Sequence, residues 1–156
     1  TMKALITKNK QWVKIDAHDT WSMDCTLAHI IVPMLKQLKE TTHGGPFVDM
    51  DERPEHLIGT LPNRESGDTD EFHFQAWDWV LDEMIWAFES KLEDWEDQFC
   101  SGRHDVIWEP LENGMSEMKY GPHHTFKIDW EARSKYQERI TNGFRLFGKY
   151  YENLWD

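Results

Sequence analysis

The chain has 156 residues, of which 39% are hydrophobic and 29% charged, a balance typical of one globular domain with a hydrophobic core. Its formal net charge of -12 disfavours direct contact with nucleic-acid phosphates and anionic membranes. No apolar run approaches the ~20 residues needed to span a bilayer, and the first residues lack the apolar core of a signal peptide. We therefore expect one cytoplasmic domain over residues 1–156.

Aromatic and cysteine content refine this expectation. Aromatic residues make up 13% of the chain, and acid-rich disordered chains are poor in them, so the composition favours a folded, Trp-rich core. Cys25 and Cys100 lie far apart in the sequence without a CxxC motif. Both are expected to be free thiols.

The first part of the chain predicts a small β-element followed by a helix. Residues 2–15 read as two short strands joined by a polar turn. A helix is expected over 21–41, with a kink at Pro33 because proline removes one backbone hydrogen bond. Three- and four-residue spacing gives this helix a buried stripe of Leu27, Ile31, Met34 and Leu38.

A long connection and the central helix come next. Residues 43–71 are rich in Pro and Gly and are expected to form a mobile connection. The helix predicted over 72–99 carries a continuous apolar stripe of Trp77, Leu81, Met84, Phe88, Leu92, Trp95 and Phe99.

The last third of the chain predicts short strands and a third helix. Strands are expected at 105–108 and within 124–128, with a turn at 112–114, and Asp129 is expected to cap a helix over 130–154. The buried stripe of that helix is Tyr136, Ile140, Phe144, Phe147, Tyr151 and Leu154.

Gly143 and Gly148 lie inside this helix, where each costs about 1 kcal/mol relative to alanine. They therefore predict close approach of another helix or a ligand. The fold class that follows is mainly α with a small antiparallel β-sheet (α+β). Three long helices surround a Trp-rich core, and the sheet is built from 3–15 and pieces of 105–128.

Two of the candidate sites lie on the first two helices. Cys25 and His29 are four residues apart, near Trp21 and Asp24, but two ligands do not make a zinc site, so a core cysteine and a histidine near the kink is the competing interpretation. The central helix carries an acidic face of Asp78, Asp82, Glu89, Glu93 and Glu96.

Di-metal centres of helical bundles use Glu-x-x-His on two helices. This chain has one such string, ending at His43, so no metal cofactor is expected. The acids of the central helix are interpreted as a solvated face or as salt-bridge partners of Arg139, Arg145 and Lys149.

The loops and the last helix supply the remaining candidates. The loop residues His104, Asp105, His123 and His124 are weak candidates for a divalent ion, and solvated loop histidines are the alternative. In the last helix, Arg145 and Lys149 lie four residues apart beside Tyr150 and could hold a phosphate or carboxylate. The ligand-binding candidates are therefore Arg145, Lys149 and Tyr150, with Trp21, His29 and His43.

Three blocks of sequence carry a resemblance. They are DTWSMDCTLAHIIVPMLKQLKETTHGGPFVD at 19–49, WDWVLDEMIWAFE at 77–89 and RITNGFRLFGKYYENLWD at 139–156. Together they resemble a family of small uncharacterised proteins encoded by large tailed bacteriophages. The resemblance covers under half of the chain and implies action in the cytoplasm of an infected bacterial host. It implies no activity and no functional residue.

Three functions follow from these observations. The leading hypothesis is a non-enzymatic phage accessory protein that binds a host or viral protein, or its own copies, through an acidic, aromatic-rich surface. The alternative is a protein that binds or sequesters a small ligand such as a nucleotide signal, using Arg145 and Lys149. The third is a metal-dependent hydrolase using the loop His and Asp. Because the chain has no phosphate-binding loop, serine nucleophile elbow or HExxH motif, no catalytic residue is assigned.

Overall fold

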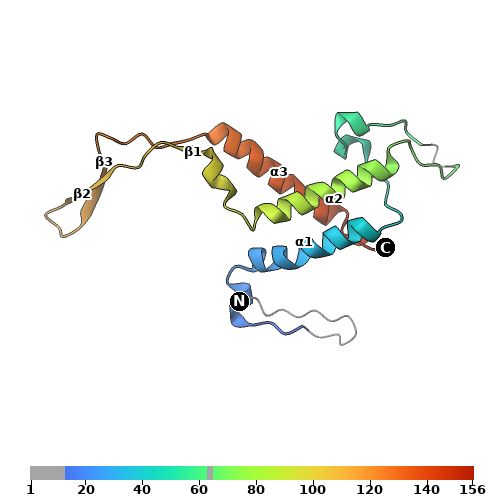
Figure 1. Ribbon diagram of the computed structural model, residues 1–156, viewed down its shortest axis with the longest axis horizontal. Coiled ribbons are helices and arrows are strands. Elements are labelled where there is room, and N and C mark those ends of the chain that lie inside the picture. The colour runs from blue at the N-terminus through green and yellow to red at the C-terminus, as the bar shows by residue number, and fades with distance from the viewer. Residues whose placement is uncertain (1–12, 63–64) are drawn as a thin grey trace. The chain divides into compact units, whose positions relative to one another are not determined.

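A computed structural model of the protein describes residues 13–62 and 65–156 (Figure 1). It contains three long helices and two small antiparallel sheets, which confirms the fold class expected from the sequence. The chain divides into two compact units: unit 1 holds the residues up to Glu93 together with Arg139–Asp156, and unit 2 holds Asp94–Glu138. Most of the hairpin expected at 2–15 lies outside the described residues. Within those residues, no helix is long and apolar enough to cross a membrane.

The helices are α1 (Met23–Thr41), α2 (His73–Ser90) and α3 (Trp130–Lys149). Helix α1 continues across Pro33. Among the described residues of unit 1, short 3-10 turns also lie at Ala17–Thr20, Met50–Glu52, Glu55–Leu57 and Tyr151–Asn153.

The prediction that the central helix runs to residue 99 is wrong, because α2 ends at Ser90. The N–H groups of Lys91 and Leu92 donate to carbonyls three residues back, at Phe88 and Glu89, and the chain then turns. A separate 3-10 helix covers Trp95–Phe99. The cause is electrostatic: the sequence places several carboxylates in and just after the last turn of α2, where the negative end of the helix dipole disfavours them.

The core of unit 1 is built on α2. Trp77, Leu81 and Met84 are buried as expected. Other residues of α2, together with residues of α1, of the connection, of α3 and just after α3, join them: Ala76, Val80, Ile85, Leu35, Val48, Leu146 and Tyr150. Both cysteines, Cys25 and Cys100, are free thiols, as predicted.

The buried stripe predicted for α1 is wrong in part. Leu27 and Met34 are 39% and 60% exposed, whereas Ala28, Val32 and Leu35 are buried and Ile31 and Leu38 flank the core. Both sets have helical spacing, so periodicity alone cannot choose between them. The small Ala28 on the buried row favours close packing of α1 on its neighbours.

The sequence predicted close approach of a helix or a ligand at both glycines of α3. The prediction is confirmed at Gly143, where α3 packs on α2, and is wrong at Gly148. A Cβ added at Gly143 would lie 2.3 Å from the Cβ of Ala87 and 2.6 Å from the carbonyl oxygen of Glu83. At Gly148 an added Cβ would meet nothing within 4 Å. Tyr151, expected in the buried stripe, is exposed, and Tyr150 is buried instead.

A buried ion pair holds the connection between α1 and α2. The Arg53 guanidinium donates to both carboxylate oxygens of Asp70, at 2.7 and 2.9 Å, and both side chains are fully buried. Arg53 also donates to the carbonyl oxygens of Val48 and Leu57, and Asp70 accepts from the N–H of Phe72. These hydrogen bonds satisfy most of the polar groups that burial removes from water. Hydrogen bonding by Arg53 lowers the pKa of the Asp70 carboxyl.

Unit 2 contains the two small sheets. Strands β1 (Cys100–Ser101) and β4 (Lys127–Ile128) form one antiparallel pair, and β2 (Val106–Pro110) and β3 (Ser116–Tyr120) form the other. The strands expected at 105–108 and 124–128 are found with altered ends, and the sequence analysis missed β3. Asp129 caps α3 by accepting from the N–H of Ala132, as predicted.

The ion pair gives the first prediction. Replacement of Arg53 by Met leaves the Asp70 carboxylate buried without its partner and should lower the free energy of unfolding by about 3 to 5 kcal/mol. Urea denaturation followed by Trp fluorescence measures this loss. The control is Lys36→Met, which breaks the exposed pair with Glu89 and should cost no more than about 1 kcal/mol. Equal effects of the two substitutions would contradict the role given to Arg53.

The two glycines of α3 give a matched pair of substitutions. Gly143→Ala should destabilise the protein, because overpacking against Ala87 costs about 1 to 3 kcal/mol and outweighs a helix-propensity gain of about 1 kcal/mol. Gly148→Ala should raise the free energy of unfolding by up to about 1 kcal/mol, since the added methyl group meets open space. Urea midpoints that shift in the same direction for both variants would refute this account.

Candidate functional site

The cation pair Arg145–Lys149 lies on the last turns of α3, where both side chains bind the connection between α1 and α2. The Arg145 guanidinium donates to both carboxylate oxygens of Glu52, one at 2.8 Å, and Lys149 donates to the same carboxylate at 2.8 Å. Lys149 also pairs with Asp49 at 2.7 Å. A carboxylate of the chain itself therefore takes the position that an anionic ligand would occupy.

Electrostatics in this cluster favour the paired state. Hydrogen bonding by Arg145, with help from Lys149, lowers the pKa of Glu52 to about 2 although burial opposes the shift. Asp49 and Glu52 in turn raise the pKa of Lys149. Tyr150, the third candidate in this segment, is buried, and its hydroxyl accepts from the Asp49 N–H at 3.3 Å. The three residues thus come together around Asp49 and Glu52 and hold the connection on α3.

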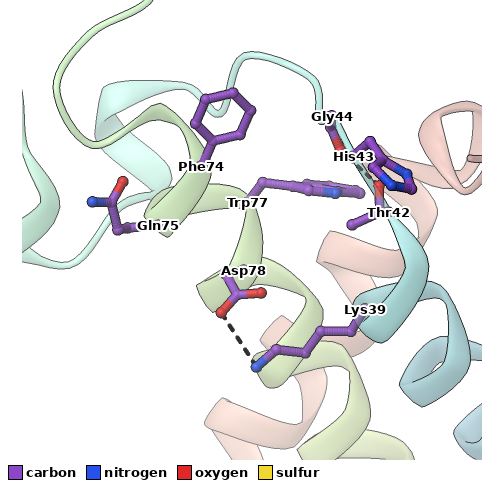
Figure 2. Close-up of a pocket in the computed structure, with 8 residues that line it drawn as sticks. All are labelled: Lys39, Thr42, His43, Gly44, Phe74, Gln75, Trp77 and Asp78. Carbon is purple, nitrogen blue, oxygen red and sulfur yellow. Dashed lines mark hydrogen bonds and ion pairs between the residues drawn. The ribbon is translucent and has the colours of Figure 1, made fainter.

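His43 lies apart from that cluster, in a shallow pocket of about 260 Å³ at the end of α1 (Figure 2). The pocket is lined by Lys39, Thr42, His43, Gly44, Phe74, Gln75, Trp77 and Asp78. Figure 2 shows the Trp77 side chain extending from α2 toward Thr42 and His43. Lys39, the one lysine of the lining, already pairs with Asp78 at 3.4 Å and with Asp82 at 2.6 Å. The pocket thus offers an incoming ligand little charge that is not already matched.

Trp21 and His29 line a second hollow, of about 320 Å³, at the start of α1. Cys25 lies in the same lining, but its thiol donates to the carbonyl oxygen of Lys91 at 3.6 Å. Asp24, the fourth residue of this sequence candidate, pairs with the Lys91 ammonium at 2.7 Å, which lowers the pKa of Asp24. The six ligand-binding candidates are therefore distributed over three places in unit 1.

The loop histidines of unit 2 do come together, around Asp105. The Asp105 carboxylate accepts from the N–H of His123 at 2.9 Å, and the Asp105 N–H donates to Nδ1 of His124 at 3.2 Å. The His104 ring stacks on Phe126, with 3.8 Å between ring centroids. Over residues 13–62 and 65–156, no group of three or more His, Cys, Asp or Glu side chains is placed to hold a metal ion. These contacts instead organise the base of the β2–β3 pair.

The acidic face of α2 is paired with basic side chains of unit 1. Lys39 forms ion pairs with Asp78 and Asp82, and Lys36 forms an ion pair with Glu89. Of the three partners that the sequence suggested, only Arg139 of α3 contacts α2. Its guanidinium donates to both carboxylate oxygens of Glu83 and lies over the Trp86 ring. The suggestion is wrong for Arg145 and Lys149, which bind Glu52. Glu93 and Glu96 lie beyond the end of α2, and Glu96 pairs with Arg133 within unit 2.

The sequence analysis missed an exposed apolar feature of unit 2, which is one face of the β2–β3 hairpin. All ten residues of the two strands are exposed. The register pairs Val106 with Tyr120 and Trp108 with Met118, so these four side chains share a face. Pro110 extends this face toward the turn. We call Val106, Trp108, Pro110, Met118 and Tyr120 the hairpin face.

The hairpin face is flanked by charge. The other side of the ribbon carries Ile107, Glu109, Glu117 and Lys119. There Lys119 forms ion pairs with both glutamates. Residues 103–121 include four acids, Asp105, Glu109, Glu112 and Glu117, against the two bases Arg103 and Lys119. Trp108 and Tyr120 are 63% and 65% exposed. Burial of such large aromatic side chains would be favourable in free energy, so their exposure leaves that free energy available for binding. The hairpin therefore exposes aromatic side chains on one side, in a segment with more acids than bases.

A signal in the sequence could have found this face. In SEMKY, Met118 and Tyr120 alternate with Glu117 and Lys119, which is the period of a half-buried strand. Gly114 precedes this segment, as a turn residue between VIWEP and SEMKY. Gly114 has a φ of 81°, which suits a three-residue hairpin loop.

Comparisons of the chain with protein-family models, curated proteins and solved structures found no match. The resemblance to a phage protein family therefore stays a prediction.

The Glu52 cluster predicts a dependence of stability on pH. Because folding lowers the pKa of Glu52 from about 4.5 to about 2, its contribution is fully present above pH 4.5 and is lost as the pH falls toward 2. The Glu52→Gln variant should thus be less stable than the original protein at pH 7, and the difference in free energy of unfolding should shrink between pH 4.5 and 2.5. Glu152→Gln, which removes an exposed charge from the same unit, controls for net charge. A difference that stays constant with pH would contradict the assignment.

Proposed function

We propose that this protein is a non-enzymatic binding protein whose hairpin face docks on a protein partner. The observation that carries the proposal is the exposure of all ten strand residues of β2 and β3, with Trp108, Met118 and Tyr120 on one side. An isolated two-stranded hairpin is marginally stable, and large apolar side chains that stay exposed stabilise it less than buried ones would. Tyr and Trp are enriched at the centres of protein interfaces, where covering them supplies much of the binding energy.

The electrostatics of the chain support a protein partner with a basic surface. The net charge of -12 works against two copies of this chain meeting face to face, and it works equally against nucleic acid or an anionic membrane. Acidic residues flank the hairpin face and would steer a basic partner toward it. We place this activity in the cytoplasm of a bacterium infected by a tailed phage, on the strength of the three sequence blocks that resemble phage proteins.

A small-ligand function at Arg145 and Lys149 is the second candidate, and the contacts favour it less. Both cations bind Glu52, and Lys149 also binds Asp49, so an anion would have to displace two carboxylates. Binding would then release the connection from α3, which lowers the net affinity by the free energy of those ion pairs.

A capture experiment with matched variants tests the proposal. The immobilised protein is exposed to a bacterial lysate, and the retained proteins are quantified by mass spectrometry. Trp108→Ser should abolish retention of at least one protein that the original chain retains. Trp155→Ser, which removes a tryptophan that is 71% exposed in unit 1, should leave that retention unchanged.

Stability measurements accompany the capture. Trp108 is 63% exposed and lies opposite Met118 in the ladder, so Trp108→Ser should change the free energy of unfolding by no more than about 1 kcal/mol. Retention that is the same for both variants, or lost equally in both, would refute docking through the hairpin face.

A further inference from the structure

The backbone of β3 offers an open edge beside the hairpin face. The ladder is bracketed by two hydrogen bonds, from the Leu111 N–H to the Met115 carbonyl and from the Gly121 N–H to the Asp105 carbonyl. Residues opposite each other in an antiparallel pair alternate between positions that face the partner strand and positions that face outward. The odd-numbered residues of both strands therefore bond across the hairpin. The even-numbered residues direct their N–H and C=O groups away from it.

The two outer edges differ in what they present. On β3 the outward groups belong to Ser116, Met118 and Tyr120, and each has an N–H donor. On β2 they belong to Val106, Trp108 and Pro110, and proline has no donor. A proline on an edge strand discourages strand pairing there, so β3 is the better template for an added strand.

The side chains at this edge define what an added strand must carry. In an antiparallel addition, the residues opposite Met118 and Tyr120 would project onto the hairpin face and extend it, which requires apolar side chains at alternate positions. The position between them would lie opposite Lys119, whose ammonium group already pairs with two glutamates, and the next such position would lie opposite Glu117. Residues 103–121 carry four acids and two bases, so basic side chains complement this face.

We infer that the partner binds as an extended, basic segment that adds an antiparallel strand to β3, with apolar side chains at every second position covering the hairpin face. This inference rests on the proposed function and specifies how the partner is recognised. Backbone hydrogen bonds to the edge supply affinity, while Met118, Tyr120 and the surrounding acids select the sequence. A second copy of the chain is a poorer occupant, because each copy has a net charge of -12.

Synthetic peptides with valine at every second position and lysine or threonine between them test the inference. Amide chemical shifts of the whole labelled protein are followed by NMR during titration. The shifts of Ser116, Met118 and Tyr120 should move most, since their N–H groups gain acceptors. The same peptide with glutamate in place of lysine should bind at least tenfold more weakly. Largest shifts on α1, α2 or α3 would overturn the inference.

N-methylation gives a matched pair of peptides. A valine opposite Met118 directs its own N–H toward β3, whereas the lysine and threonine N–H groups point to solvent. Methylation of the valine amides should therefore weaken binding at least tenfold, and methylation of the lysine and threonine amides should change it less than about threefold. Equal affinity of the two methylated peptides would overturn strand addition.

Substitutions in the protein test the same edge. Met118→Pro removes the outward donor, and Met118→Ala removes the side chain but keeps the donor. Strand addition expects the proline variant to bind the peptide at least threefold more weakly than the alanine variant. Should the proline variant lose the hairpin amide pattern, the methylated peptides still decide the matter.

The outcomes separate this inference from the proposed function. Loss of capture on Trp108→Ser together with insensitivity to valine methylation would leave docking intact and reject strand addition. Capture that survives Trp108→Ser would reject both. Sedimentation showing a dimer of the original chain that Met118→Pro dissociates would also overturn the inference, because a second copy would then occupy the β3 edge.

Discussion

The buried pair between Arg53 and Asp70 is the constraint on which the arrangement of unit 1 depends. Desolvating two charges is costly, and the pair is tolerable only because its hydrogen-bonding groups are satisfied by Val48, Leu57 and Phe72 as well as by each other. These bonds fix a connection that has little regular structure of its own. They place Val48 in the core and hold the start of α2 against the connection.

Fixing Arg53 also positions its neighbour in the sequence. Glu52 reaches Arg145 and Lys149 on α3, so one short 3-10 turn links the connection to the last helix. The glycine at position 143 completes this arrangement by allowing α3 to approach Ala87 on α2. Arg145 and Lys149, which the sequence offered as ligand-binding candidates, are therefore part of the same structural network. For this reason the binding surface is proposed on another part of the chain, the hairpin face.

The sequence predicts the elements well and their partners poorly, for reasons that particular residues make clear. Helical periodicity located all three helices, and the turn expected at 112–114 is present, although the strand that follows it was missed. Periodicity could not decide whether the helical face with Leu27 or the one with Ala28 is buried, because both faces are apolar at the same spacing. Arg53 and Asp70 are separated by 17 positions in a segment without periodicity, so no local signal joins them. The partners of Arg145 likewise depend on how the connection folds back.

The two units differ in their apolar side chains, and the contrast bears on function. In unit 1 the charges bind one another, and the helices bury an apolar core built on α2. On the hairpin the charges also pair, through Lys119, but the apolar side faces water. The turn, the ladder and the cross-strand pairs define the ribbon but leave much of Trp108 and Tyr120 in water. The docking that we propose for the hairpin face would cover these aromatic side chains, and strand addition would cover the neighbouring edge of β3.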